Sequence, residues 1–258
     1  MSVKPRSPAD TIVLIPARLR STRLPDKPLA EIGGEPMIVH VWRRALAAEV
    51  GRVLVACGER AIADAITAVG GEAVLTDPDL PSGTDRIHQA LGRLDPARRF
   101  AKVINLQGDL PTLEPALIRR VLEPIERLGC DMGTLATATD DPAEKADPNV
   151  VKAVIAFDVK HPGLGRALYF TRACAPAGDG PVHHHIGIYA YRRAVLERLA
   201  GLPPSPLERR ERLEQLRALE AGISIGVALV DTVPLGVDTP HDLQRARAQL
   251  AGARTATS

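Results

Sequence analysis

The sequence predicts an α/β fold with a parallel sheet, joined to a smaller β region. In the first half of the chain, short apolar runs typical of buried strands alternate with stretches whose apolar residues recur at helical spacing. Strand, helix and strand at this spacing indicate parallel strands joined by right-handed crossovers. Neither an internal repeat nor a linker divides the 258 residues, so we expect a single domain over residues 1–258.

Each expected element follows from a local pattern. Apolar, partly β-branched runs predict the strands, and apolar stripes at helical spacing predict the helices. The expected strands are 12–15, 52–56, 72–76, 102–106, 132–139, 150–157, 186–191 and 223–230. The expected helices are 36–49, 60–69, one that starts at 82–86, 114–128 with an interruption at Pro124, 192–200, 207–221 and 240–250. The segment 158–185, rich in Gly, Pro and His, is expected to form loops, and the ends 1–10 and 252–258 are expected to be disordered.

The composition argues against several classes of function. A net charge of +2, with no lysine-rich or arginine-rich run, argues against nucleic acid as a partner. No apolar run approaches the length of a membrane span and the N-terminus lacks the apolar core of a signal peptide, so we expect no membrane insertion. Cys57, Cys130 and Cys174 lie far apart without metal-binding or redox spacing, which favours a reducing compartment and hence the cytoplasm.

A basic loop follows the first predicted strand. Its prolines rule out a regular helix. Its cations are Arg18, Arg20, Arg23 and Lys27. Ligands of open α/β sheets bind beyond the carboxyl ends of the strands, so this loop suits a polyphosphate. A solvated surface loop explains the same charges equally well.

Two aspartates are candidate ligands of a hard cation. Asp109 comes directly after a buried strand and Gly108, which would let the backbone turn tightly. Asp238 stands between an apolar strand and Thr239-Pro240. Mg²⁺ is usually held by one or two carboxylates together with substrate phosphates. Capping of the following helix explains either aspartate as well.

The histidines 183–185 suggest a metal site at first sight. Adjacent residues of a strand point to opposite faces, so consecutive histidines cannot converge on one ion. His185, with Tyr189 in phase on the same strand, is the more useful candidate, and a surface histidine at a loop edge is the alternative. Ser82 stands at a predicted helix start and could simply cap that helix.

The remaining sequence patterns indicate structural roles or argue against particular classes of enzyme. The charged side chains of 207–221 are typical of an exposed helix face with ion pairs. The glycine-rich fingerprints of dinucleotide and P-loop sites are absent from the sequence, and so is the G-x-S-x-G pattern of serine hydrolases.

Eight short motifs occur in order along nearly the whole chain. They are I-P-A-R-x-x-S-T-R-L-P-x-K-P-L at 15–29, P-M-I-V-H-V at 36–41, S-G-T-D-R at 82–86, N-L-Q-G-D at 105–109, A-L-Y-F-T-R at 167–172, H-I-G-I-Y-A-Y-R at 185–192, P-S-P-L-E-x-x-E-x-L-E-Q-L-R at 204–217 and G-V-D-T-P-x-D-L at 236–243. Together they resemble the 3-deoxy-manno-octulosonate (KDO) cytidylyltransferases, also called CMP-KDO synthetases. The resemblance implies a nucleotide-diphospho-sugar-transferase-like fold, which is a Rossmann-like mixed sheet in three layers. It also implies a homodimer that uses Mg²⁺ to transfer CMP from CTP to KDO, releasing pyrophosphate, in lipopolysaccharide biosynthesis.

The resemblance also implies roles for particular residues. The catalytic residues would be Arg18, Lys27, Asp109 and Asp238, with Asp109 and Asp238 holding Mg²⁺. The nucleotide would be bound by Pro16, Ala17, Arg18, Arg23, Lys27, Ser82, Gly83 and Arg86. The acidic sugar would be bound by Gln107, Arg172, His185, Tyr189, Glu214 and Gln215.

The chain departs from the family pattern at a few positions. Leu110 replaces a usual glutamate, Ala56-Cys57-Gly58-Glu59 replaces an acidic strand end, and Asp26 replaces a common glycine. These departures leave two alternatives open. One is a cytidylyltransferase for another acidic sugar, such as 8-amino-KDO or a sialic-acid-like sugar. The other is a catalytically weak nucleotide-binding protein with a regulatory role.

Overall fold

The computed structural model describes residues 10–20 and 23–255, and their side chains as far as residue 252. The chain forms two compact units, Met1–Ile118 with Pro234–Ser258, and Arg119–Val233. The expected disorder of the ends concerns mainly residues 1–9 and 256–258, which lie outside the described residues, as do Ser21 and Thr22 of the basic loop. The expectation of a single domain stays a prediction.

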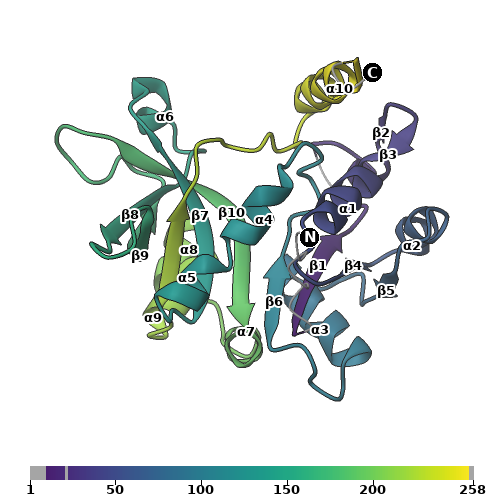
Figure 1. The fold of residues 1–258 in the computed structure, drawn as a ribbon, viewed down its shortest axis with the longest axis horizontal. Coiled ribbons are helices and arrows are strands. Elements are labelled where there is room, and N and C mark those ends of the chain that lie inside the picture. The colour runs from purple at the N-terminus through teal and green to yellow at the C-terminus, as the bar shows by residue number, and fades with distance from the viewer. Residues whose placement is uncertain (1–9, 21–22, 256–258) are drawn as a thin grey trace, which may run out of the picture. The chain divides into compact units, whose positions relative to one another are not determined.

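A parallel sheet forms the centre of the first unit (Figure 1). Its strands follow the order β5 (Ala73–Leu75), β4 (Arg52–Cys57), β1 (Thr11–Ala17) and β6 (Lys102–Asn105). Neighbouring strands pair in parallel, with Val13 of β1 opposite Val53 on one side and Ile104 on the other. Ile12 to Ile15 are 0% exposed, so β1 is a buried central strand, as its continuous apolar run predicts.

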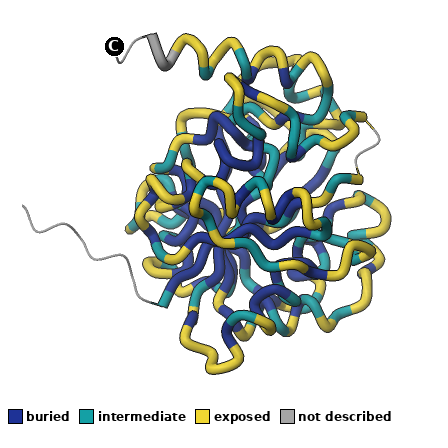
Figure 2. Tube along the Cα trace, turned by 90° about the vertical axis from the view of Figure 1, so that its right-hand side faces the viewer, coloured by how far each residue is buried: buried dark blue, intermediate teal, exposed yellow. Residues whose placement is uncertain are grey.

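Helices flank this sheet. α1 (Met37–Ala47) and α2 (Arg60–Thr67) contact β4, and α3 (Gly83–Leu94) contacts β1. The short helix η1 (Lys27–Leu29) ends the basic loop, and the hairpin of β2 (Glu31–Ile32) and β3 (Glu35–Pro36) follows it. The C-terminal helix α10 (Pro240–Thr255) buries Leu243 and Ala246 against Ile32 and Met37, while most of its surface is exposed (Figure 2).

The second unit has a mixed sheet. Its strands follow the order β10 (Val182–Arg192), β7 (Met132–Thr139), β11 (Ile225–Leu229), β9 (Leu164–Thr171) and β8 (Lys152–Phe157). β11 runs parallel to β7, whereas β10–β7, β11–β9 and β8–β9 are antiparallel pairs. β8 also pairs with β10, at Lys152 and His184, so the strands close on themselves. This unit contains the expected smaller β region, and the α/β class is confirmed.

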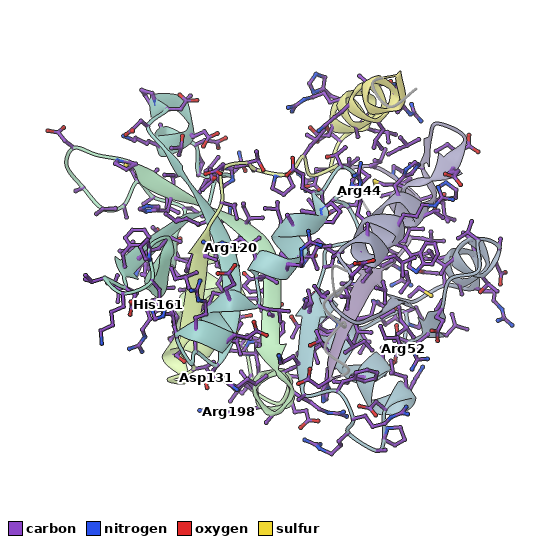
Figure 3. The ribbon with its side chains drawn as sticks, viewed as in Figure 1. Arg44, Arg52, Arg120, Asp131, His161 and Arg198 are labelled. Carbon is purple, nitrogen blue, oxygen red and sulfur yellow. The ribbon has the colours of Figure 1, made fainter. Side chains whose placement is uncertain are left out.

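Short helices connect the strands of the second unit. They are α5 (Glu123–Arg127), α6 (Pro142–Ala146), α7 (Arg193–Ala200), α8 (Pro206–Glu211) and α9 (Gln215–Glu220), with α4 (Pro115–Arg120) preceding α5 at the boundary of the units. Arg120, labelled in Figure 3, donates from Nε to the Leu229 carbonyl of β11 over 3.4 Å. No helix in the described part of the chain is both long and apolar enough to cross a membrane.

The loop prediction for 158–185 is wrong, because β9 and the start of β10 lie there. The sequence pattern hides β9, because a glycine in this segment is also typical of a loop. A Cβ on Gly165 would lie 2.5 Å from Ile155 Cγ2 of β8, so this glycine allows two strands to approach closely. The expected helix 207–221 is interrupted at Arg212, which has a φ of 57° between α8 and α9. The interruption expected at Pro124 is confirmed, since Pro124 lies in the first turn of α5.

Candidate functional site

A basic cavity of about 700 Å³ opens at the carboxyl end of β1. Its lining comes from the end of β1, the basic loop, the start of α3 and the segment after β6. The lining residues are Pro16, Ala17, Arg18, Arg20, Arg23, Lys27, Pro28, Leu80, Ser82, Gly83, Arg86, Gln107, Gly108 and Asp109. Every residue predicted to bind the nucleotide is among them, together with Gln107, which was predicted for the sugar.

Lys27 joins the two candidate metal ligands at this cavity. Its Nζ donates to Asp109 Oδ2 over 2.7 Å and to Asp238 Oδ1 over 3.0 Å. Arg23 Nη2 lies 3.1 Å from the other oxygen of Asp238. Burial by itself would lower the pKa of Lys27, but the carboxylates of Asp109 and Asp238 raise it above its ordinary value. Lys27 is therefore a cation at neutral pH, and carboxylates far apart in sequence converge on it.

The capping alternative fails for Asp238. Thr239 caps α10 instead: its Oγ1 accepts from the Asp242 amide over 3.2 Å and donates to Asp242 Oδ2 over 2.8 Å. For Asp109 the next helix, α4, begins only at Pro115. The Val237 amide donates to the Asp109 carbonyl over 3.0 Å, which brings the two aspartate segments together.

Glycines allow the cavity wall to pack closely against the end of β1. A Cβ on Gly108 would lie 2.8 Å from the Pro16 carbonyl oxygen, and one on Gly83 would lie 3.3 Å from Pro16 Cγ. Gly108 is thus required by the close approach of two backbones, where the sequence suggested a tight turn.

Ser82 caps α3, as its alternative interpretation holds. Its Oγ accepts from the Asp85 amide over 3.1 Å and donates to Asp85 Oδ2 over 2.8 Å. Ser82 also lines the cavity, so the cap does not remove it from the site.

Arg86 is a buried arginine in the cavity wall, with 2% of its surface exposed. Its Nη1 donates to Thr76 Oγ1 over 2.6 Å and to the Asp77 carbonyl over 3.0 Å. Burial lowers the pKa of Arg86; the charge of Glu59 opposes this shift, and the charge of Arg18 adds to it. Arg86 therefore holds the segment after β5 in place and adds positive charge to the wall.

The structure explains the departures from the family pattern at Asp26 and Glu59, and nothing in it explains the one at Leu110. Asp26 has a φ of 51°, a left-handed conformation that glycine adopts most easily and aspartate tolerates. Glu59 accepts from the Leu19 amide over 3.1 Å and so holds the basic loop. Cys57 is buried, and burial together with Glu59 raises the pKa of its thiol to about 11. Leu110 is buried.

One contact at the cavity has no signal in the sequence. Arg20, which lines the cavity at a position the family motif leaves free, pairs with Asp79 over 2.6 Å, and both side chains are largely exposed. Neither this pair nor the role of Glu59 is marked by a motif.

The second unit brings together part of the predicted sugar set. The rings of His185 and Tyr189 are 5.6 Å apart, and burial raises the pKa of Tyr189 well above its ordinary value, with Glu214 adding to the rise. Burial also lowers the pKa of His185 to about 3, with a smaller effect of His184, so its imidazole is neutral at physiological pH. Gln215 is buried in α9.

Arg172 is engaged with the backbone. Its Nε donates to the Glu211 carbonyl and its Nη1 to the Pro148 carbonyl, each over 2.9 Å. The amide of Arg172 also donates to the Glu211 side chain over 3.0 Å. The structure therefore places Arg172 in a polar network with the end of α8.

The consecutive histidines have separate partners, which supports the argument against a metal site. His183 contacts Phe157, His184 Nδ1 lies 3.3 Å from Glu144, and His185 contacts Phe170. Among the residues that the structure describes, no group of three or more His, Cys, Asp or Glu side chains could hold a metal ion.

Only some of the charged side chains of 207–221 lie on a solvent-exposed face. Glu208 and Arg217 form a bidentate pair with 12% and 11% of their side chains exposed. Glu208 also completes a capping box with Ser205 at the start of α8. This pair is largely shielded from solvent, so these two residues are an exception to the interpretation as exposed ion pairs.

Comparison with known proteins places the chain in a family. The sequence profile of the cytidylyltransferases matches residues 12–225. The 3-deoxy-manno-octulosonate cytidylyltransferase of Parvibaculum lavamentivorans is 63% identical over 93% of this chain and 92% of its own length. That of Rhodospirillum centenum is 58% identical over 99% of both chains.

A solved structure agrees with these relatives. A CMP:2-keto-3-deoxy-manno-octonic acid synthetase in complex with CTP superposes with a TM-score of 0.87, at 39% identity, over 95% of this chain and 100% of that protein. The expected nucleotide-sugar-transferase-like fold is thereby confirmed. The chain belongs to the 3-deoxy-manno-octulosonate cytidylyltransferase family.

Proposed function

We propose that this protein transfers CMP from CTP to 3-deoxy-D-manno-octulosonate, releases pyrophosphate, and so activates this sugar for lipopolysaccharide biosynthesis. The observation that carries the proposal is the convergence of Asp109 and Asp238 on Lys27 beside a cavity lined by arginines. A protein that only binds a nucleotide needs cations, but it has no need of paired carboxylates where the phosphates would lie. This pairing supports an enzyme over a regulatory binding protein.

In the proposed reaction the anomeric hydroxyl of the sugar attacks the α-phosphorus of CTP. The new bond joins that oxygen to the α-phosphorus. The bond between the α-phosphorus and the oxygen that bridges to the β-phosphorus breaks, so pyrophosphate leaves, and the hydroxyl proton is lost to solvent. Such a transfer depends chiefly on positioning and on neutralising charge. Arg18, Arg23 and Lys27 would hold the triphosphate, while the Arg86 charge adds to the favourable potential.

Asp109 and Asp238 fit a divalent metal, which nucleotidyltransferases of this kind generally use. Both carboxylates lie within 3.0 Å of one cationic nitrogen, so they already face a common cation. We propose Mg²⁺, which is commonly held by one or two carboxylates together with substrate phosphates. Bound there, it would neutralise phosphate charge and ease loss of the sugar hydroxyl proton.

The acidic sugar is proposed to bind His185, Tyr189, Glu214 and Gln215 in the second unit, with Gln107 and Arg172 as further contacts. The neutral His185 can exchange hydrogen bonds with sugar hydroxyls but cannot form an ion pair with the sugar carboxylate. The positive charge for that carboxylate must therefore come from an arginine or lysine.

The decisive assay measures pyrophosphate released from CTP and Mg²⁺ with KDO, 8-amino-KDO or sialic acid. We expect release of pyrophosphate with KDO. Release only with another sugar would show that this other sugar is the substrate, and no release with any of them would refute the proposed enzymatic activity. Asp109→Ala and Asp238→Ala should each lower the rate by roughly a hundredfold or more. Asp79→Asn, which removes a carboxylate that pairs with Arg20 of the cavity lining, is the matched control and should keep most of the rate.

We further propose that both units act as one cytidylyltransferase domain, and that the protein is a homodimer in the cytoplasm. The family resemblance supports the dimer, which light scattering tests directly: a monomeric mass would contradict it. Free thiols at Cys57, Cys130 and Cys174, together with the use of CTP, support the cytoplasm.

A further inference from the structure

A bulge in β10 brings His185 and Tyr189 together. Ile186 pairs with Leu135 and Tyr189 with Thr134, so β10 advances three residues while β7 advances one. Residues four apart in a regular strand are separated by about 13 Å. The rings of His185 and Tyr189 are instead 5.6 Å apart. The bulge therefore creates the side-by-side arrangement of these two rings.

Thr134 holds this bulge from the neighbouring strand. The side chain is fully buried, at 0% exposure. Its Oγ1 lies 3.1 Å from the Ile186 carbonyl, 2.9 Å from the Ile188 carbonyl and 3.0 Å from His185 Nε2. A buried hydroxyl thus contacts the carbonyl before the extra residues, the carbonyl of the second extra residue, and the predicted sugar-binding histidine as well.

These contacts determine the tautomer of His185. A carbonyl only accepts hydrogen bonds, so the single proton of the Thr134 hydroxyl points to the carbonyls of Ile186 and Ile188. The hydroxyl oxygen then accepts from His185 Nε2–H, which leaves the lone pair of the ring on Nδ1. Phe170 contacts the same ring edge-on, with centroids 4.9 Å apart, and restricts its rotation.

We propose that Thr134 is the positioning residue of the acidic-sugar site, because its hydroxyl holds the bulge and makes His185 Nδ1 a hydrogen-bond acceptor for a sugar hydroxyl. This inference rests on the proposed function. Thr134 itself is buried in β7 and acts on the sugar only through His185 and the bulge. Tyr189, beside that imidazole, would contact the same part of the sugar.

The kinetic test removes the hydroxyl with little change of shape. Thr134→Val should raise KM for KDO about tenfold or more, because it removes the hydrogen bond that orients His185. KM for CTP should stay within about twofold, since the proposed CTP cavity is lined by the other unit. Thr134→Ser keeps the hydroxyl and should restore most of the affinity for KDO.

Thr137→Val is the matched control. Thr137 lies on the same strand, is also buried, and donates its hydroxyl to the Val230 carbonyl at the other side of β7. It should lower stability without a selective rise in KM for KDO. Equal effects of Thr134→Val and Thr137→Val on KM, or no effect of Thr134→Val in a folded protein, would overturn the proposal.

A second measurement needs neither turnover nor a folded variant at position 134. ¹⁵N NMR of the histidine side chains, with His185→Gln to assign the signal, should show the Nε2–H tautomer at His185 in the wild-type protein. An Nδ1–H tautomer or a charged ring would overturn the proposal. If the wild type shows the expected tautomer but releases no pyrophosphate with KDO, the proposed function fails while the geometry around Thr134 stands.

Discussion

Replacing Lys27 by methionine is expected to strengthen divalent-metal binding in the absence of nucleotide. The Lys27 ammonium lies where it neutralises both Asp109 and Asp238, so a metal ion must compete with it for the same oxygens. Methionine keeps most of the length and volume of the side chain but carries no charge. In the Lys27→Met variant a metal ion can therefore bind Asp109 and Asp238 without first displacing a cation, which lowers the free-energy cost of binding.

The magnitude follows from the two contacts that the metal must replace. A hydrogen bond to a charged group contributes about 1.5–3 kcal/mol when it is well buried. Asp109 is 29% and Asp238 48% exposed, so water and salt weaken both contacts. We estimate about 1–2 kcal/mol for the pair together, which corresponds to roughly a 5- to 30-fold decrease in Kd.

The assay is the binding of Mn²⁺ without nucleotide, followed by the electron paramagnetic resonance signal of free Mn²⁺. Arg20→Met removes the same charge from the same cavity, but Arg20 pairs with Asp79, so its Mn²⁺ affinity should match the wild type within about twofold. Unchanged or weaker Mn²⁺ binding by Lys27→Met would refute the reasoning. With CTP bound, the advantage of the variant should shrink, because the proposed role of Lys27 in the wild type is then to contact phosphate.

Further predictions concern the backbone and pH. Asp26→Gly should leave the free energy of unfolding within about 1 kcal/mol of the wild type, whereas Asp26→Val should lower it by about 1–2 kcal/mol in urea titrations, because the φ there is 51°. Gly108→Ala should lower kcat about tenfold, since its methyl would lie 2.8 Å from the Pro16 carbonyl oxygen, while Gly236→Ala, with its nearest neighbour 3.9 Å away, should change kcat less than about twofold. Asp131 is labelled in Figure 3. The Ser224 hydroxyl lowers the pKa of Asp131, so this contact stabilises the fold fully above the unfolded value of 3.8 and less as pH falls through the folded value. Ser224→Ala should therefore lower Tm at neutral pH, and a difference from the wild type that stays constant down to about pH 3 would contradict this.

Most of the fold could be predicted because buried strands carry continuous apolar runs. β7 has the bounds that its run predicts, and β1 and β4 differ from prediction by only a few residues. β9 was missed because its exposed positions include Leu168 and its close packing requires Gly165, so its pattern lacks the usual alternation. Such a strand is defined by its pairing with β8, which is a tertiary property.

The residues that line the cavity could be expected to lie together because their charges cluster in sequence. Arg18, Arg23 and Lys27 occur together in a loop after a strand, and the sheet places that loop at one end of β1. Thr134 could not be found this way, because nothing local distinguishes it from Thr137 on the same strand. Only the register between β7 and β10 shows which hydroxyl reaches the bulge.

The two aspartates show why local sequence leaves capping and metal binding undecided. In Asp238-Thr239-Pro240, either of the first two residues has a side chain that can cap the following helix. Thr239 caps α10 through its hydrogen bonds with Asp242, and the carboxylate of Asp238 therefore remains free to face Lys27. A capping residue one position away is thus what makes the aspartate available for chemistry. Thr239→Ala tests this: if Asp238 then turns to cap α10, Mn²⁺ affinity should fall although no proposed metal ligand has been changed.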